Sequence, residues 1–180
     1  IMTYTKKMFD PLAPDPALID IEDISHALSM LCRANGHFPT FYSVCQHSIN
    51  CMQEAKARNY SRRVQLACLL HDASEAYLSD VTRPVKAELP RYKEIEAPLQ
   101  DAIWNKWLDT PLDKEEIRQV FEIDDAVLLH EFLTLMGEKI ADHILNSGAA
   151  VKMHCQIGGG HCEADWEQLV PTFMNFLWTE

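Results

Sequence analysis

The chain has 180 residues, of which 47% are apolar and 24% are charged, and its formal net charge is −11. This size and composition favour one soluble domain with a single core, and no apolar run approaches the roughly 18 residues of a membrane span. The acidic excess works against binding to nucleic acid, although a cleft with a metal ion and a few basic groups can still hold a small phosphorylated ligand. We therefore expect neither a nucleic-acid nor a membrane partner.

Cysteine usage and the first residues indicate a cytoplasmic protein. Most of the six cysteines, at positions 32, 45, 51, 68, 155 and 162, fall inside apolar helical patterns, which is typical of reduced core thiols rather than of a disulfide framework. The opening stretch "IMTYTKKMFDPL" shows neither a long apolar core nor a small-residue cleavage site.

The first part of the chain predicts an extended arm followed by a helix. Prolines at 11, 14 and 16 favour a turn-rich or extended lead-in over residues 1–19. Asp20 is placed to cap a helix in "DIEDISHALSMLCR", where apolar side chains at 21, 24, 28 and 31 follow a helical spacing. We assign residues 20–180 to the domain itself, including a helical extension at its C-terminal end.

Two further caps predict the next helices. Ser43 and Gln46 form an S-x-x-Q capping box, which places His47 in the first turn of a helix and exposed enough to face a cleft. Ser61 precedes "RRVQLACLLHDASEAYL", a pattern that predicts one helix with His71 toward its C-terminal end. That helix should give way to a loop before Pro84.

The remaining elements are also predicted to be helical. The stretches 90–108 and 113–145 carry helical patterns, and Asp113 with Glu116 forms another capping box. Glycines at 148 and 158–160 mark a flexible region, and residues 162–178 predict a last helix that Pro171 kinks or splits. Because no long alternating pattern is present, the fold class is all-α, with at most a short hairpin near 149–163.

An adjacent His71 and Asp72, with Glu75 three residues later, could converge on one face of a helix and begin a metal site. His47 and an Asp from the pair 124–125 would complete a set of two His and two Asp ligands. The alternative is a hydrogen-bonded His-Asp pair at a helix end among unrelated surface groups. If Phe121, Leu128 and Phe132 form the buried stripe of the long helix, the two Asp residues flank it almost equally.

Three segments resemble the H…HD…D signature of HD-domain phosphohydrolases. They are "QHS" at 46–48, "LLHDASEAYLSDVTRPVK" at 69–86 and "DDAV" at 124–127. The resemblance spans roughly residues 20–140 and is similar in detail to short bacterial 5'-deoxynucleotidases and phage-type deoxynucleoside triphosphate phosphohydrolases. The block "HDASE…D…PVK" is far more specific than an isolated His-Asp pair.

The resemblance implies a helical HD-domain bundle and a role for each matching residue. The implied ligands of a divalent ion (Mn, Co, Zn, Ni, Fe or Mg) are His47, His71, Asp72 and Asp125. The implied catalytic carboxylates are Glu75, which would orient or deprotonate a water, and Asp80, which would assist the leaving oxygen. Candidate substrate contacts are Arg33, whose planar fork suits a phosphate, His37 and Lys86.

The expected function is 5'-phosphate hydrolysis of deoxynucleoside monophosphates by a cytoplasmic homo-oligomer. One alternative is a triphosphohydrolase that releases triphosphate, since the N-terminal segment is similar to phage-type members. A second alternative is a nucleotide-binding sensor without turnover.

A second His/Cys group surrounds the glycines near the C-terminal end: His154, Cys155, His161 and Cys162. Its spacing departs from the C-x2-C and H-x3-H patterns, because adjacent residues on an extended chain point apart. We do not expect a structural metal there.

Overall fold

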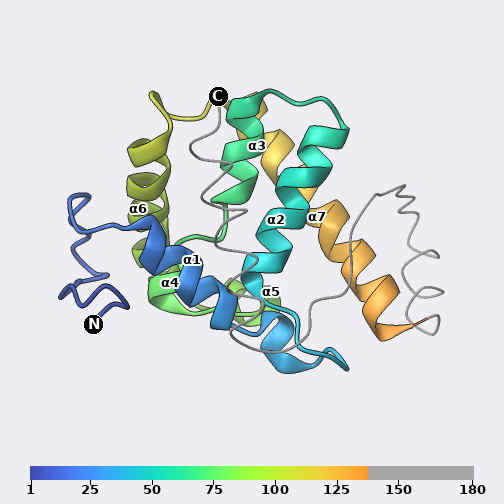
Figure 1. The fold of residues 1–180 in the computed structure, drawn as a ribbon, viewed down its shortest axis with the longest axis horizontal. Helices are drawn as coiled ribbons and strands as arrows, with labels where there is room; N and C mark the ends of the chain where they lie inside the picture. Colours follow the sequence, from blue (N-terminus) through green and yellow to red (C-terminus); the bar gives the residue numbers. More distant parts are fainter. Residues whose placement is uncertain (138–180) are drawn as a thin grey trace.

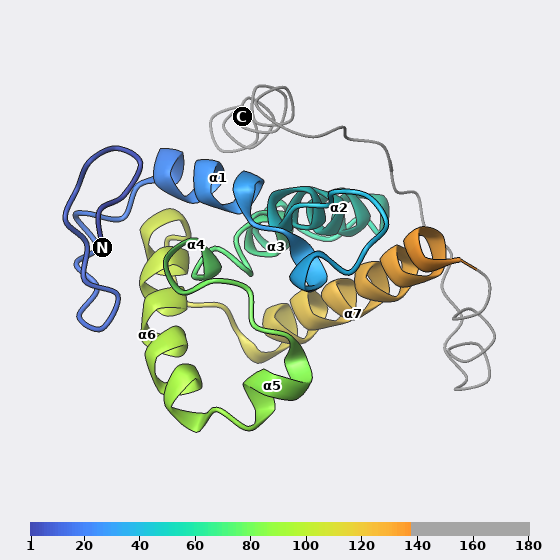
Figure 2. The same ribbon diagram turned by 90° about the horizontal axis from the view of Figure 1, so that it is seen from below.

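The computed structural model describes residues 1–137, and over this range the protein is all-α, as predicted (Figures 1 and 2). The elements are α1 (Ile21–Met30), a 3-10 turn η1 (Arg33–Gly36), α2 (Val44–Ala57), α3 (Arg62–Leu69), α4 (Glu75–Leu78), α5 (Arg83–Ala87), α6 (Pro90–Trp107) and α7 (Lys114–Met136). Within the same range, β-pairing is limited to isolated bridges between Met2 and Met8 and between Cys32 and Ser43. The predicted helix end at 138–145, hairpin and last helix lie outside the described residues.

The four predicted N-cap side chains each accept a hydrogen bond from a backbone amide of the helix that follows: Asp20, Ser43, Ser61 and Asp113. The capping box is complete at Asp113, whose amide donates to the Glu116 carboxylate. At Ser43 only half of the box forms, because the Gln46 side chain donates to Asn50 instead. Local cap chemistry therefore fixes where four of the described helices begin.

The predicted helix over 62–78 is interrupted, which corrects the sequence prediction. α3 ends at Leu69, residues 70–74 form a turn, and the chain becomes helical again only in α4. Gln100 of α6 holds both ends of this turn, because its Nε2 donates to Leu70 O at 2.8 Å and its Oε1 accepts from Ser74 N at 3.1 Å. The turn, and not a helix face, therefore carries the adjacent His71 and Asp72.

The N-terminal lead-in has no helix, as predicted, but it is not a detached arm. Phe9 and Ile19 are only 2% and 1% exposed and belong to the same core as α1. The backbone amide and the hydroxyl of Thr5 both donate to the Asp23 carboxylate on α1. Residues 1–19 are therefore an integral layer of the domain.

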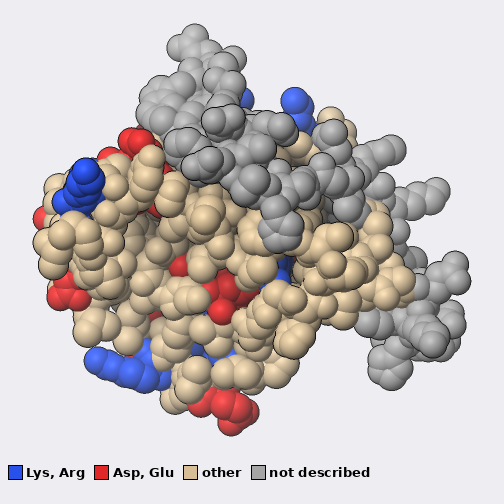
Figure 3. All heavy atoms as spheres, turned by 60° about the horizontal axis from the view of Figure 1, so that its bottom comes forward, with Lys and Arg blue, Asp and Glu red and all other residues tan. Residues whose placement is uncertain are grey.

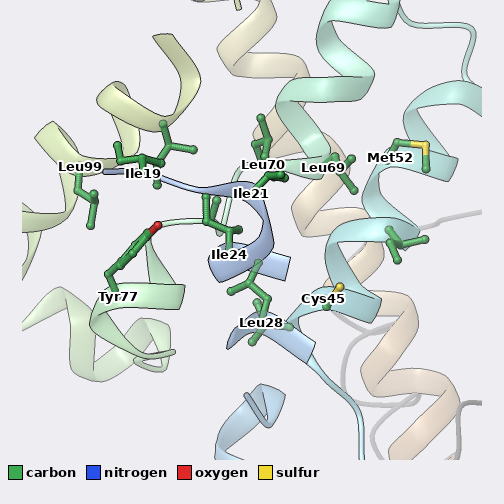
Figure 4. Close-up of a cluster of buried hydrophobic side chains, with 14 of the residues drawn as sticks. Ile19, Ile21, Ile24, Leu28, Cys45, Met52, Leu69, Leu70, Tyr77 and Leu99 are labelled. Carbon is green, nitrogen blue, oxygen red and sulfur yellow. The ribbon is translucent and has the colours of Figure 1, made fainter. Parts of the chain in front are cut away.

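Two clusters of buried apolar side chains share α2. The first joins the lead-in, α1, α2, the 70–74 turn and α6, and its members include Ile19, Ile24, Leu28, Cys45, Leu69, Leu70 and Leu99 (Figure 4). The second joins α2, α3 and α7 through side chains that include Cys51, Val64, Cys68, Val120, Ile123 and Val127. Helix α2 packs against α1, α3 and α7, so the site described next lies beside a helix fixed on several sides. Among the helices of residues 1–137, none is both long and apolar enough to cross a membrane.

Candidate metal centre

Two histidine rings from different segments face each other beside α2. His47 belongs to α2 and His71 to the 70–74 turn, and their Nε2 atoms lie 3.3 Å apart. His47 is fully buried, at 0% exposure, so the prediction of an exposed position near the helix start was wrong. Val44 and Cys45 of the same turn are also buried, because the start of α2 is covered by the core.

Two carboxylates meet the two imidazole rings. Asp124 Oδ1 lies 3.1 Å from His47 Nε2 and 3.6 Å from His71 Nε2. Asp72 Oδ2 lies 3.2 Å from His71 Nε2 and 3.7 Å from His47 Nε2. The structure thus brings together three of the four predicted ligands and replaces the fourth.

The choice of Asp125 is corrected to Asp124. The Asp125 side chain is 64% exposed and pairs with Arg83, whereas Asp124 is buried. The buried face of α7 runs through Val120, Ile123 and Val127, and Asp124 lies on it one turn after Val120. Phe121, expected in the buried stripe, is 56% exposed, so the predicted helical face was rotated from the true one.

The spacing of these four oxygen and nitrogen atoms fits a single ion. The two Nε2 atoms lie 3.3 Å apart, and each lies 3.1–3.7 Å from the two carboxylate oxygens. Ligand bonds of about 2.0–2.1 Å to a transition ion place neighbouring ligand atoms about 3.0–3.4 Å apart. The side chains therefore need to move little to share one ion.

Cys51 is a fifth potential ligand, although its sequence pattern predicted only a reduced thiol in the core. One ligand atom from each of His47, Cys51, His71 and Asp124 lies within 4.8 Å of the others. The position of Cys51, one helical turn after His47, is the sequence feature that could have indicated this role. Burial, with the charges of Asp124 and Glu131, raises the pKa of the Cys51 thiol well above its ordinary value. Cys51 and Asp72 are thus both placed to supply a fourth ligand, and the resemblance implies Asp72, whose Oδ2 lies 3.2 Å from His71 Nε2.

Both imidazoles are oriented by hydrogen bonds at their outer nitrogen. His71 Nδ1 lies 2.7 Å from Cys68 O, which can only accept. His47 Nδ1 lies 2.6 Å from Glu131 Oε1. A proton held at Nδ1 leaves Nε2 of each ring as the inward-facing atom, the arrangement found in many metal-binding histidines.

Arg33, a candidate phosphate contact, lies inside this group of charges. Its Nε donates to Glu131 Oε2 at 3.2 Å and its Nη1 to Asp72 Oδ2 at 3.2 Å, and its Nη2 lies 3.5 Å from Asp124 Oδ1. Burial alone would lower the pKa of Arg33, but the three carboxylates raise it above its ordinary value. The guanidinium is therefore a permanent positive charge beside the candidate metal ligands.

The candidate ligand carboxylates are ionised despite burial. Desolvation acts to raise the pKa of Asp72, but His71, Arg33 and His47 lower it below its ordinary value. Desolvation also opposes ionisation of Asp124, and hydrogen bonds with His47 and His71 lower its pKa. A low pKa keeps both groups in the form that binds a cation.

The two predicted catalytic carboxylates have the opposite character. Glu75 is 4% exposed and its Oε2 has no hydrogen-bond partner among residues 1–137, while Lys86 Nζ lies 3.5 Å from Oε1. Burial, together with the charges of Asp72 and Asp80, raises the pKa of Glu75 well above its ordinary value. Burial also raises the pKa of Asp80, with a further contribution from Asp72. Carboxyl groups with raised pKa values suit proton transfer near neutral pH.

The predicted substrate contacts are placed differently from one another. Lys86 lies between Glu75 and Glu96, at 2.7 Å from Glu96 Oε1. His37 is exposed at the end of η1, and no side-chain contact described within residues 1–137 joins it to the histidine pair. Arg83, which is not among the predicted contacts, is 55% exposed and bridges Asp124 and Asp125 at 2.5 Å.

The solvent-facing side of the molecule near these elements is acidic. Seen from its lower side, Asp and Glu atoms gather in a hollow, with Lys or Arg atoms at its edge (Figure 3). The side chains of Asp72 and Asp124 remain 18% and 12% exposed, whereas His47 is fully enclosed. Solvent therefore reaches the carboxylate side of the site.

The second His/Cys group, at 154–162, lies outside the described residues.

Comparisons with known proteins give relatives without a described activity. No protein-family model matches the chain. It is 37% identical over 109 residues to the uncharacterized protein YfdR of Escherichia coli, a match that covers 59% of this chain and 57% of the relative. It is 40% identical over 103 residues to an uncharacterized protein of Rhodobacter capsulatus, with 54% and 52% covered. The chain thus spans about half the length of these curated relatives.

Proposed function

We propose that the protein is a metal-dependent phosphohydrolase of small deoxynucleotides, with deoxynucleoside monophosphates as the first candidate substrates. One observation carries the proposal. Two inward-facing imidazole nitrogens lie 3.3 Å apart, and each lies 3.1–3.7 Å from two ionised carboxylates, with a buried carboxyl group of raised pKa nearby in the chain. The resemblance to HD-domain phosphohydrolases supports the same reading.

The residues that would hold the ion are His47, His71, Asp72 and Asp124. A mixture of imidazole and carboxylate ligands suits Mn, Fe, Co, Ni or Zn, whereas Mg prefers a site made of oxygen ligands alone. A divalent ion at this position would polarise a phosphate oxygen and lower the pKa of a bound water.

The remaining chemistry belongs to the chain itself. Glu75, buried and only weakly paired, would take the proton of the attacking water. Asp80, whose pKa is also raised, would deliver a proton to the departing 5' oxygen. Arg33 would balance the negative charge that develops on the phosphate, since a buried guanidinium needs no reorganisation to do so.

A triphosphate substrate is the second candidate, and the position of Arg83 favours it. This side chain is half exposed and contacts Asp124 from the solvent side, whereas Arg33 is buried behind the carboxylates. A second cation farther out could bind the outer phosphates of a longer chain. The product then would be a nucleoside and triphosphate instead of a nucleoside and inorganic phosphate.

The test is a substrate panel on metal-stripped protein reloaded with single divalent ions. Deoxynucleoside monophosphates, ribonucleoside monophosphates and deoxynucleoside triphosphates are compared, and nucleoside, inorganic phosphate and triphosphate are each quantified. We expect inorganic phosphate from the monophosphates; triphosphate release instead would reverse the order of the two candidates. Absence of turnover with every ion, together with tight nucleotide binding, would support a sensor in place of an enzyme.

A matched pair of variants separates catalysis from binding. Glu75→Ala should remove turnover while leaving the four candidate ligands in place, and Glu94→Ala, an exposed carboxylate of α6 paired with Arg91, is the control. Unchanged hydrolysis by Glu75→Ala would exclude the mechanism given above.

Following the resemblance, we also propose a cytoplasmic homo-oligomer. Light scattering of the purified protein measures the number of subunits.

A further inference from the structure

Glu131 is a buried carboxylate that the proposed chemistry does not use. It lies on α7, two helical turns after Asp124, and is 1% exposed. Burying a negative charge is costly unless it is fully paired, so a carboxylate in this position requires a compensating arrangement around it. Its neighbours supply one.

Three donors converge on this single carboxylate. Oε1 faces His47 Nδ1 at 2.6 Å and accepts from the Tyr42 hydroxyl at 2.8 Å, and Oε2 accepts from Arg33 Nε at 3.2 Å. Despite burial, His47, Arg33 and Tyr42 lower the pKa of Glu131 below its ordinary value. Both oxygens are therefore occupied, and each partner comes from a different element.

The direction of donation is fixed by a chain of amides behind Tyr42. Gln46 Nε2 donates to Asn50 Oδ1 at 3.1 Å, and Asn50 Nδ2 donates to the Tyr42 oxygen at 2.6 Å. Since the Tyr42 hydroxyl receives that bond, its only proton goes to Glu131. Glu131 therefore acts purely as an acceptor, and His47 must hold its proton at Nδ1.

We propose that Glu131 is the positioning residue of the site: one carboxylate sets the ligand nitrogen of His47 and the orientation of the Arg33 guanidinium. Held at its Nε edge, Arg33 keeps its two terminal nitrogens directed at the Asp72 and Asp124 side of the site. Glu131 thus orients both His47, the candidate metal ligand, and Arg33, the candidate phosphate-binding residue. This assignment rests on the proposed metal function for one of its readouts and on ring geometry alone for the other.

Glutamine cannot replace Glu131 in either orientation of its amide. If the amide oxygen faces His47 and Tyr42, its NH2 group faces the Arg33 Nε–H, and two donors oppose each other. If the oxygen faces Arg33, the NH2 group faces His47 Nδ1 and favours the proton on Nε2. The near-isosteric Glu131→Gln therefore perturbs the site through hydrogen bonding and not through volume.

The experiment measures two properties of Glu131→Gln. The first is divalent-ion affinity, obtained by competition with a chromophoric chelator on the metal-stripped protein. The second is the protonation of the His47 ring nitrogens, read from 15N shifts in histidine-labelled, metal-free protein. The matched control is Glu122→Gln on the same helix, whose carboxylate pairs with Arg58 and Arg118 at the surface. Tyr42→Phe removes one donor but keeps the carboxylate.

We expect Glu131→Gln to lose about 10–100-fold in ion affinity, the usual effect of removing an outer partner of a ligating histidine. In the orientation whose NH2 group faces His47, the ring should also lose its exclusive Nδ1 proton. Glu122→Gln should keep wild-type affinity and ring shifts, and Tyr42→Phe should lose no more than a few-fold in affinity.

Two negative results have different meanings. Wild-type affinity together with unchanged His47 shifts in Glu131→Gln would overturn the positioning role. A wild-type protein that binds no ion, but whose His47 proton still depends on Glu131, would overturn the metal function and retain the positioning role. Should Glu131→Gln fail to fold, a Tyr42→Phe variant with the full loss in affinity would contradict the assignment, because its carboxylate is intact.

Discussion

His47 and His71 place their Nε2 atoms 3.3 Å apart, while the Nδ1 atom of each ring faces an acceptor, Glu131 or Cys68 O. Two lone pairs in this position repel each other unless a proton or a cation lies between them. A binding ion should therefore raise thermal stability, by about 2.7 kcal/mol at a hundredfold excess over its Kd. Differential scanning calorimetry with Mn, Co or Zn, reversed by a chelator, measures this. A melting temperature that no divalent ion raises would contradict the site, and His71→Ala should abolish the response.

The neighbouring residues Asp124 and Asp125 should behave oppositely on substitution. Asp124→Asn removes a ligand, so we expect a loss in ion affinity at least as large as the about 10–100-fold typical of an outer-partner mutation. Asp125→Asn removes only an exposed partner of Arg83 and should change the affinity little. Chelator competition on both variants measures the difference. Equal losses would show that the register of α7 does not decide which carboxylate binds.

Cys51 should remain a thiol in the metal-loaded protein. The cobalt-substituted protein is then expected to lack a thiolate-to-cobalt charge-transfer band in its absorption spectrum. Cys51→Ser should bind cobalt as the wild type does, whereas Asp72→Asn should bind it more weakly. A charge-transfer band that disappears in Cys51→Ser would instead place the sulfur among the ligands.

Glu75→Gln should stabilise the metal-free protein at neutral pH while reducing turnover by about 10²–10⁴-fold. Because burial raises the pKa of Glu75 above its ordinary value of 4.5, the folded protein holds this proton more tightly than the unfolded chain does. The wild-type free energy of unfolding therefore falls as pH rises from about 4.5 through the raised folded pKa. The gap in melting temperature between variant and wild type should be small near pH 4 and widen toward neutrality. A gap independent of pH would mean that Glu75 titrates normally.

Gln100→Leu should destabilise the turn that carries His71 and Asp72. The substitution leaves Ser74 N buried without its acceptor, at a cost of about 1–3 kcal/mol. It also removes one of the two hydrogen bonds to Leu70 O, which still accepts from Ala73 N. Urea unfolding measures the loss, and Asn105→Leu, an exposed amide on the same helix, is the control. We also expect weaker ion binding in Gln100→Leu, because the candidate ligands His71 and Asp72 lie between the two residues that Gln100 holds.

The sequence predicted the parts of the fold that local chemistry decides. The caps at Asp20, Ser43, Ser61 and Asp113 need only a side chain and the next few amides, and all four are present. The turn at 70–74 depends on Gln100, which lies 26 to 30 residues away, so helical periodicity alone predicted one uninterrupted helix there. Long-range partners are invisible to a local pattern.

The candidate site was predictable in its residue types but not in its register. His47, His71 and Asp72 meet as the H…HD pattern predicts, and Arg33 lies against them. The choice between Asp124 and Asp125 failed because the large aromatic Phe121 was taken as buried, although the smaller Val120 and Ile123 form the packed face. Glu131 was missed because a carboxylate near a helix end usually faces solvent.

Helix α2 belongs to both buried clusters, and this restricts how an ion can reach the candidate metal centre. The same helix supplies side chains to both buried clusters and carries His47, so sliding one cluster over the other would pull His47 away from its partners. Exchange of a bound ion is therefore expected without rearrangement of the interior. We expect an ion to enter on the side of Asp72, Asp124 and Arg83, whose side chains are 18%, 12% and 55% exposed.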